Sequence, residues 1–269
     1  MSISGPITIT VLGSGTSVGV PTIGCPCAVC HSDDPRDKRL RPSVLVSFDA
    51  KGRRRNIVVD TTPDFRVQAL TSGFAWLDAI LYTHAHADHI MGLDDIRPFN
   101  YGRPDRIPAY GQQEALDVIQ NAFPYAFTER ATHPGGLPRV DAIALESDPV
   151  DLFGVLFHPV PVWHGKRKIF GYRFGRAAYL TDQSDIPEES IPLLEGLDVL
   201  FLDALRRIPH PSHSTVDQAL DWVKRLKPKR AYLTHICHDL GHEETNADLP
   251  RGVELAYDGL TIETSGDAG

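Results

Sequence analysis

The sequence predicts an α/β (α+β) protein in which two mixed sheets pack face to face and helices cover them. Three observations lead to this prediction. Short strand-like apolar runs recur along the 269 residues, they alternate with amphipathic helical patterns, and several runs end directly in an aspartate or a histidine. A chain of this length with 42% hydrophobic residues can bury one large core.

The elements follow one another without a break in pattern. Strands are expected over 7–12, 44–48, 56–60, 78–82, 107–110, 155–160, 169–174, 177–180, 198–202 and 230–233, and helices over 64–70, 112–122 and 214–226. The basic residues 51–55 are expected to form a solvated hairpin tip, and the segment 123–149, rich in proline and glycine, a lid or a dimer contact. No repeat or linker divides the chain, so we expect one domain over residues 1–269.

A glycine-rich turn at 13–19 follows the first strand and resembles a dinucleotide-binding fingerprint. That fingerprint needs a helix directly after it, whose N-terminus holds a pyrophosphate. Pro21, Gly24 and Pro26 break any helix here. We therefore expect a permissive loop close to the functional site and no dinucleotide site.

Four potential metal ligands, His84, His86, Asp88 and His89, follow the strand over 78–82 within six residues. An isolated His-x-His is usually a surface feature, but four such groups crowded after a buried strand carry a desolvation cost that a metal relieves. Three further candidates, His164, Asp182 and His235, also come directly after apolar runs. Imidazole and carboxylate are the ligands of hydrolytic metal sites, so the sequence predicts a two-metal hydrolase.

A cysteine loop at about 24–31 places Cys25, Cys27 and Cys30 within six residues. These cysteines are too close together for an ordinary disulfide framework, and their number is odd. The same spacing suits a tetrahedral zinc site. The fourth ligand is expected from the segment after His235. On an extended segment, the side chains of Cys237 and His235 would point to the same face and that of His238 to the other. We favour His238 as the zinc ligand because we expect the strand to end before this residue. The alternative is a small apolar cluster of reduced cysteines.

Together these motifs resemble the metallo-β-lactamase superfamily, whose fold is an αββα sandwich. With the cysteine loop and the stretches Leu12-Gly13-Ser14-Gly15-Thr16 and Leu233-Thr234-His235, the resemblance narrows to phosphoribosyl 1,2-cyclic phosphate phosphodiesterases, accessory enzymes of carbon–phosphorus lyase pathways, and covers nearly the whole chain. The resemblance implies two divalent metals and a hydroxide between them as the nucleophile. It implies His84, His86 and His164 on one metal, Asp88, His89 and His235 on the other, and Asp182 as the bridge.

Two features separate this chain from other branches of the superfamily. Drug-hydrolysing members generally lack the bridging aspartate, so Asp182 argues against a lactamase. Flavin-dependent di-iron members would carry a carboxylate at the position of His86. Trp163, before His164, is an unexpected residue for the family and leaves the shape of the local pocket open.

A proton donor is needed if the leaving group is an alkoxide. His213 lies at the start of the helical pattern over 214–226, with Ser214 as its expected cap, and the resemblance places a histidine of this loop at the substrate phosphate. We expect His213 and the metal ligand Asp88 to be the catalytic residues, with His210 as the alternative donor. Asp60 and Asp203 end two strands and are expected to orient metal-bound imidazoles, although a turn or cap role is nearly as plausible.

The formal net charge of −8 disfavours extended nucleic acid and suits a small phosphate ester, such as 5-phosphoribosyl 1,2-cyclic phosphate. The alternatives are a tRNA 3′-processing endonuclease, whose RNA-gripping arm we do not find, a 2′,3′-cyclic nucleotide phosphodiesterase, and a non-catalytic nucleotide-binding module. Zinc is expected at the cysteines, and zinc, manganese or iron at the catalytic pair. Free thiols and the absence of a membrane-length apolar run predict a cytoplasmic protein, with a homodimer as an open possibility.

Overall fold

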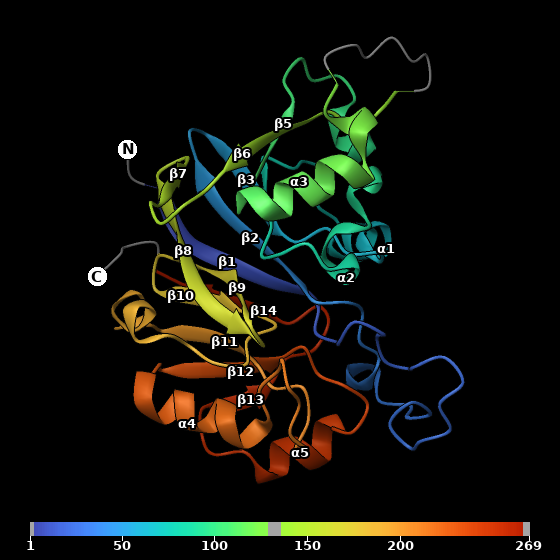
Figure 1. Cartoon of the computed structure of the whole chain (residues 1–269), viewed down its shortest axis with the longest axis vertical. Coiled ribbons are helices and arrows are strands. Elements are labelled where there is room, and N and C mark those ends of the chain that lie inside the picture. Colours follow the sequence, from blue (N-terminus) through green and yellow to red (C-terminus); the bar gives the residue numbers. More distant parts are fainter. Residues whose placement is uncertain (1–2, 129–135, 266–269) are drawn as a thin grey trace.

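The computed structural model describes residues 3–128 and 136–265, which form two seven-stranded sheets packed face to face (Figure 1). The first sheet has the order β14-β1-β2-β3-β4-β5-β6 and the second β13-β12-β11-β10-β9-β8-β7. Both are mixed, because β3 to β6 and β10 to β13 are parallel while the remaining pairs are antiparallel. The strands are β1 (Ser4–Gly13), β2 (Ser43–Ala50), β3 (Arg53–Val59), β4 (Ala79–Leu81), β5 (Ile107–Gly111), β6 (Val140–Ala144), β7 (Val150–Leu152), β8 (Val155–His164), β9 (Arg167–Phe174), β10 (Ala177–Leu180), β11 (Val199–Asp203), β12 (Arg230–Thr234), β13 (Val253–Leu255) and β14 (Thr261–Thr264).

Helices cover the outer face of each sheet. In Figure 1, α1, α2 and α3 lie beside the first sheet, and α4 and α5 lie beside the second. The α-helices are α1 (Phe65–Ser72), α2 (Ala87–Ile90), α3 (Gln113–Ala122), α4 (Val216–Leu226) and α5 (His242–Asp248), and the 3₁₀ helices are η1 (Pro35–Asp37), η2 (Leu93–Asn100), η3 (Pro124–Ala126) and η4 (Glu188–Leu194). The predicted architecture of two packed mixed sheets flanked by helices is confirmed.

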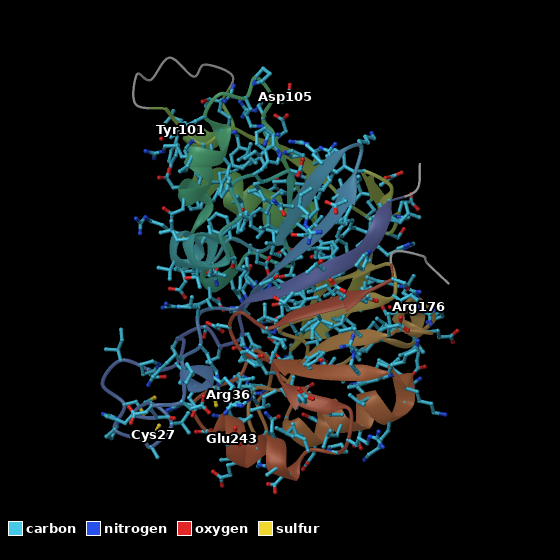
Figure 2. All side chains as sticks on the ribbon, turned by 180° about the vertical axis from the view of Figure 1, so that it is seen from behind. Cys27, Arg36, Tyr101, Asp105, Arg176 and Glu243 are labelled. Carbon is cyan, nitrogen blue, oxygen red and sulfur yellow. The ribbon has the colours of Figure 1, made fainter. Side chains whose placement is uncertain are left out.

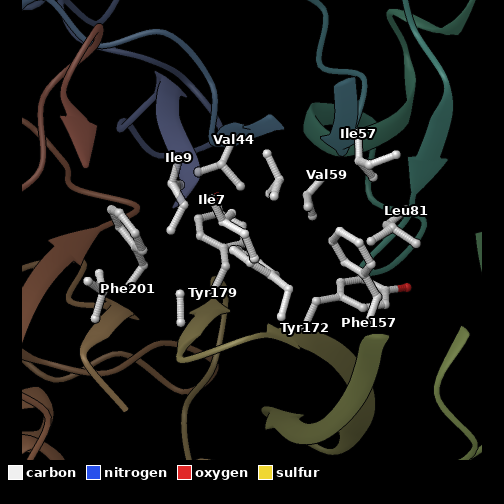
Figure 3. Close-up of a cluster of buried hydrophobic side chains, with 14 of the residues drawn as sticks. Ile7, Ile9, Val44, Ile57, Val59, Leu81, Phe157, Tyr172, Tyr179 and Phe201 are labelled. Carbon is white, nitrogen blue, oxygen red and sulfur yellow. The ribbon is translucent and has the colours of Figure 1, made fainter. Parts of the chain in front are cut away.

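The apolar strands are buried on both faces, which explains why they read as continuous hydrophobic runs. Successive side chains of a strand point to opposite faces of the sheet. In β3, Ile57 and Val59 enter the core between the sheets, while Val58 enters the core under the outer helices. Figure 3 shows the inner core, where these two side chains face aromatic residues of the second sheet, such as Phe157 and Tyr172.

Some local expectations were wrong. The hairpin tip is only Lys51-Gly52, because β3 already begins at Arg53, and Arg55 is buried with its Nη1 3.1 Å from Asp78 Oδ1. Within 123–149, residues 140–144 form β6, which extends the first sheet in parallel beside β5. Residues 129–135, the middle of the expected lid or dimer contact, lie outside the described residues. The expected helices over 64–70 and 112–122 correspond to α1 and α3.

The cap of α4 is also one residue later than expected. The side chain of Thr215 accepts a hydrogen bond from Gln218 N at 3.2 Å, and the side chain of Gln218 accepts one from Thr215 N at 2.8 Å. This reciprocal capping box satisfies two N–H groups that the helix cannot satisfy itself. Ser214 instead donates its backbone N–H to the carbonyl of Gln183. This hydrogen bond connects the loop before α4 to the segment that follows β10. Within 3–128 and 136–265, no helix has the length and apolar character needed to cross a bilayer.

Candidate active site

The ends of the parallel strands of both sheets carry the polar residues of the site. Asp60 follows β3, Asp182 follows β10 by two residues, and His235 follows β12. All three have positive φ angles, of 66°, 58° and 58°, in the left-handed region that residues with a Cβ rarely adopt. Such backbone strain concentrates at functional sites, where it aims side chains that a continuing strand would direct elsewhere.

A first group of ligands consists of His84, His86 and His164, each of which offers a ring nitrogen within 4.8 Å of the others. Nε2 of His84 lies 2.9 Å from Nδ1 of His86, so two imidazole nitrogens face each other across a short gap. Nδ1 of His164 donates to the carbonyls of Asp182 and Ser212, at 2.6 and 2.9 Å. This fixes the tautomer that leaves Nε2 free to bind a metal. His86 is exposed, so the group opens to solvent at that ring.

A second group brings together Asp88, His89, Asp182 and His235, again within 4.8 Å. Nε2 of His89 lies 3.2 Å from Asp182 Oδ2, and Nε2 of His235 lies 3.3 Å from Asp182 Oδ1. Neither Nε2 atom has a hydrogen-bond partner within the described chain, although both rings are buried. Buried polar atoms without partners are costly, and a shared cation would satisfy all of them.

Asp182 lies between the two groups. Its Oδ1 atom is 4.0 Å from His84 Nε2 of the first group, in addition to its contacts with the second. Its Oδ2 atom accepts a hydrogen bond from Thr181 Oγ1 at 2.7 Å, which holds the carboxylate in place. One carboxylate therefore lies close to histidine nitrogens of both groups.

The electrostatics of the second group favour cations. Burial alone would lower the pKa of His89, but Asp182 and Asp88 hold that pKa well above its ordinary value. Burial would also lower the pKa of His235, but Asp182 and Asp88 raise that pKa to about 9. In the first group, burial and the charge on His89 hold the pKa of His84 well below its ordinary value. Neutral imidazoles beside a buried surplus of carboxylate charge form a donor set that fits divalent metals.

Asp60 and Asp203 contact the far sides of these rings. Asp60 Oδ2 accepts from His89 Nδ1 at 2.7 Å, and the backbone N–H and hydroxyl of Thr83 donate to the same carboxylate. Asp203 Oδ2 accepts from His213 Nδ1 at 2.8 Å and lies 3.5 Å from Nδ1 of His235. Both carboxylates are fully buried, so each orients a ring from behind.

His213 lies beside both ligand groups. Its ring stacks on that of His235 with centroids 4.5 Å apart, and lies 4.9 Å from the ring of His164. One of its nitrogens is within 4.8 Å of ligand atoms of His164 and Asp182. The alternative donor, His210, contacts Ser212 rather than Asp203, and its ring lies 4.9 Å from that of His213. Of these two histidines, only His213 combines a carboxylate partner with proximity to the ligands.

The cysteine loop projects beside α5, as Cys27, Arg36 and Glu243 show in Figure 2. Nδ1 of His238 lies 3.0, 3.4 and 3.6 Å from the sulfurs of Cys25, Cys27 and Cys30. A hydrogen bond from the backbone of Cys30 is the largest of the effects that lower the pKa of Cys27 to about 6, toward the thiolate that binds zinc. Cys237 lies outside this group, and burial raises its pKa to about 11. The structure therefore gathers the four predicted zinc ligands.

Arg39, which no sequence pattern indicated, is a fully buried arginine that joins the two halves of the cysteine site. Its guanidinium donates to the carbonyls of Cys237 and Leu240, at 2.8 and 2.6 Å, and pairs with Asp37 at 2.9 Å. It thus ties the chain after the cysteine loop to the segment that carries His235 and His238. No periodic pattern marks such a residue, because its partners are backbone atoms about 200 positions away.

Comparison with known proteins agrees with this geometry. Residues 55–236 match the family described as Beta-lactamase superfamily domain. The chain has the metallo-β-lactamase fold. It belongs to the beta-lactamase superfamily, as the motifs predicted.

Three similar proteins illustrate the relationship. A crystal structure named a new diphosphatase from the PhnP family is 52% identical, with a TM-score of 0.88 over 96% of this chain and 98% of that one. Zn(2+)-bound PqqB from Methylobacterium extorquens, 18% identical, shares the fold with a TM-score of 0.77 over 96% of this chain and 100% of that one. An octanoyltransferase of Porphyromonas gingivalis is 41% identical over 253 residues, which are 93% of this chain. The chain spans about half the length of that relative, 50%.

Proposed function

We propose that the protein is a dinuclear metal-dependent phosphodiesterase that hydrolyses a small cyclic phosphodiester, with 5-phosphoribosyl 1,2-cyclic phosphate as the first candidate substrate. The observation that carries the proposal is the carboxylate of Asp182, which lies within 4.0 Å of histidine nitrogens from both ligand groups. The proposed ligands are His84, His86 and His164 for one metal and Asp88, His89 and His235 for the other, with Asp182 shared. Zinc, manganese or iron fits these donors, and zinc fits Cys25, Cys27, Cys30 and His238.

Metals bound by these ligands would supply the positive charge that activates a water molecule as the nucleophile and offsets the charge of the phosphoryl oxygens. The side chains supply orientation and proton transfer. Asp60 holds the ring of His89 through its Nδ1 atom. His213, held through Nδ1 by Asp203, is the proposed general acid, which donates the proton of its other nitrogen to the departing alkoxide. Asp203 stabilises the ring orientation that this transfer requires.

A diphosphate ester is the second candidate substrate, because the relative that is 52% identical is named a diphosphatase. The same ligand arrangement suits both reactions, since each requires attack of hydroxide on a phosphorus atom that bears an ester or anhydride oxygen. The two differ in the leaving group. A phosphate leaves without much help, whereas an alkoxide needs a proton, so the hydrogen-bonded pair of His213 and Asp203 favours the cyclic ester.

Acyl transfer, the activity in the name of the longer relative, receives less support from this chain. The only cysteine outside the cysteine loop is Cys237, whose buried thiol has a pKa raised to about 11 and is a poor nucleophile. We infer that the octanoyl transfer of that relative belongs to the half that this chain does not match. We further propose that residues 1–269 form one domain and that the protein is cytoplasmic, a location that suits its free thiols, and a homodimer is one assembly to be tested.

Phosphorus NMR of the metal-loaded protein tests this proposal. 5-Phosphoribosyl 1,2-cyclic phosphate and UDP-glucose are incubated separately, with the His86→Ala protein as the blank. We expect the cyclic phosphate to convert to a phosphate monoester in the wild type only. Cleavage of UDP-glucose alone would replace the first candidate by the second. An unchanged spectrum for both, with the metal sites filled, would reject phosphodiester and diphosphate hydrolysis together.

A further inference from the structure

Two buried residues, Ile236 and Cys237, separate the cysteine site from the second ligand group along the chain. His235 before them belongs to the second ligand group, and His238 after them belongs to the cysteine site. The four backbone polar groups of this link all bond to other segments: Ile236 donates to Ser14 O at 2.9 Å and accepts from Thr16 N at 3.1 Å, and Cys237 donates to Leu205 O at 3.0 Å and accepts from Arg39 Nη1 at 2.8 Å. A close-packed link of this kind transmits a displacement of one histidine to the other.

Arg39 contacts this link and also closes the base of the cysteine loop. Its backbone N–H donates to Val20 O at 2.7 Å and its carbonyl accepts from Val20 N at 2.8 Å, so residues 21–38 leave and return at one point. From there its guanidinium reaches the carbonyl of Cys237, and the ion pair with Asp37 at 2.9 Å holds it in place. A guanidinium binds several oxygens in fixed directions, which an ammonium group cannot do. One residue therefore connects the loop of three cysteines to the link between the two sites.

The backbone of His235 depends on support from its surroundings. Its φ of 58° lies in the left-handed region, and strain of this kind persists only where neighbouring contacts enforce it. The glycine-rich turn supplies part of that support, because it bonds to both the N–H and the carbonyl of Ile236. A Cβ at Gly15 would lie 2.9 Å from the Cβ of Arg39, so the turn packs directly on the arginine. Arg39 thus supports the conformation that aims the His235 ring at the second ligand group.

We propose that Arg39 is a positioning residue that couples the cysteine site to the second ligand group, so that zinc at the cysteines strengthens metal binding by His235 and its neighbours. The inference rests on the ligand sets of the proposed function and goes beyond them, because the cysteine site then acts on the catalytic site and not only on its own loop. Zinc restricts the cysteine loop and the His238 ring. The link and Arg39 pass that restriction to His235, whose ring then loses less conformational freedom when a metal binds.

Manganese(II) titrations followed by electron paramagnetic resonance measure this coupling, because thiolates select zinc whereas imidazole and carboxylate ligands also accept manganese. The wild type is titrated with one equivalent of zinc and again after zinc removal. We expect zinc to lower the Kd of the second ligand group for manganese by ~10–100-fold. Coupling is reciprocal, so manganese should lower the Kd of the cysteine site for zinc by the same factor.

The variant Arg39→Lys keeps the charge and loses the fork of donors. Elemental analysis should still find its zinc, but the effect of zinc on manganese binding should fall below about threefold. The matched control is Arg55→Lys. Arg55 is also buried, donates to the carbonyl of Ala50 and pairs with Asp78, but it lies near the start of β3, away from the ligands at the strand ends. Arg55→Lys should retain the full coupling.

Amide hydrogen exchange of the wild type adds a readout that needs no variant. Zinc removal should speed exchange of the Ile236 and Cys237 amides by ~10-fold or more, because their hydrogen bonds belong to the link, while the amide of Val58 within β3 keeps its rate. Unchanged exchange at both amides would overturn the proposal.

The titrations separate this inference from the proposed function. Equal manganese affinity with and without zinc, full coupling in Arg39→Lys, or an equal loss of coupling in Arg55→Lys would overturn the role of Arg39 alone. Absence of manganese binding at both ligand groups would reject the two-metal site, and with it the proposed function and the coupling. Intact coupling in a protein that cleaves neither candidate substrate would reject only the proposed function.

Discussion

Removal of the imidazole of His213 should slow the reaction according to the basicity of the leaving group. His213 is held at 2.8 Å by the buried carboxylate of Asp203, and its ring lies 4.9 Å from that of His164. A positioned general acid contributes ~10²- to 10⁴-fold to the rate when the leaving oxygen is a poor one. His213→Ala should therefore lower kcat by about this factor for an alkyl phosphodiester and by far less for bis(p-nitrophenyl) phosphate.

Asp203→Asn should reproduce part of this loss. It keeps the size of the side chain and removes a charge-assisted hydrogen bond worth ~1.5–3 kcal/mol, which corresponds to about 10–100-fold in kcat. In the His213→Ala background the same change should have a smaller effect, limited to the contact with His235 at 3.5 Å. The non-additivity of the double mutant then measures the coupling of Asp203 to His213.

The assay is steady-state kcat on an alkyl and an aryl diester at matched metal content. His210→Ala is the control, because this nearby histidine has no carboxylate partner in the described chain. Equal losses on both diesters in His213→Ala would refute general-acid catalysis and leave His213 a binding or structural role. A loss in His210→Ala as large as in His213→Ala would transfer the role to the neighbour.

Three further predictions concern the metal sites. Asp60→Asn should weaken binding at the second ligand group by ~10–100-fold in a chelator competition titration, because the His89 ring loses its carboxylate partner at 2.7 Å, and equal affinity would contradict this. His238→Ala should lose the zinc of the cysteine loop in elemental analysis while Cys237→Ser keeps it, and the reverse result would exchange their roles. Metal affinity at the second ligand group should fall by at least tenfold per unit as the pH decreases below about 9, because only neutral rings bind, the pKa of His235 in the metal-free site is about 9, and the pKa of His89 is raised as well; a flat profile from pH 9 to 6 would contradict this.

The strand ends made most of the site predictable from the sequence. Runs such as the one ending at Tyr82 or Leu202 are buried on both faces, so the polar residues that follow within one or two positions must lie at an edge of the core. Parallel strands bring those edges together, which is why His84 and Asp203 were found without knowledge of the fold. The spacing of the cysteines was equally informative, and the end of β12 at Thr234 leaves His238 free to turn toward them.

What the sequence left open depends on long-range contacts. The strand β6 was missed because four of its five residues are exposed or partly exposed, so the strand lacks the usual pattern of buried apolar residues. Arg55 was expected in solvent, yet it is buried against Asp78, a residue 23 positions later. The cap of α4 was misplaced by one residue because Ser214 and Thr215 are both good caps, and the capping box that Thr215 forms with Gln218 decides between them.

We propose that the two ligand groups joined by Asp182 direct water to phosphorus. Hydrolysis of 5-phosphoribosyl 1,2-cyclic phosphate in ¹⁸O-enriched water, followed by phosphorus NMR, tests it most directly. We expect one ¹⁸O atom in the phosphate of the product, with turnover lost in Asp182→Asn. An ¹⁸O atom on the sugar carbon instead, or undiminished turnover in Asp182→Asn with both metals bound, would contradict it.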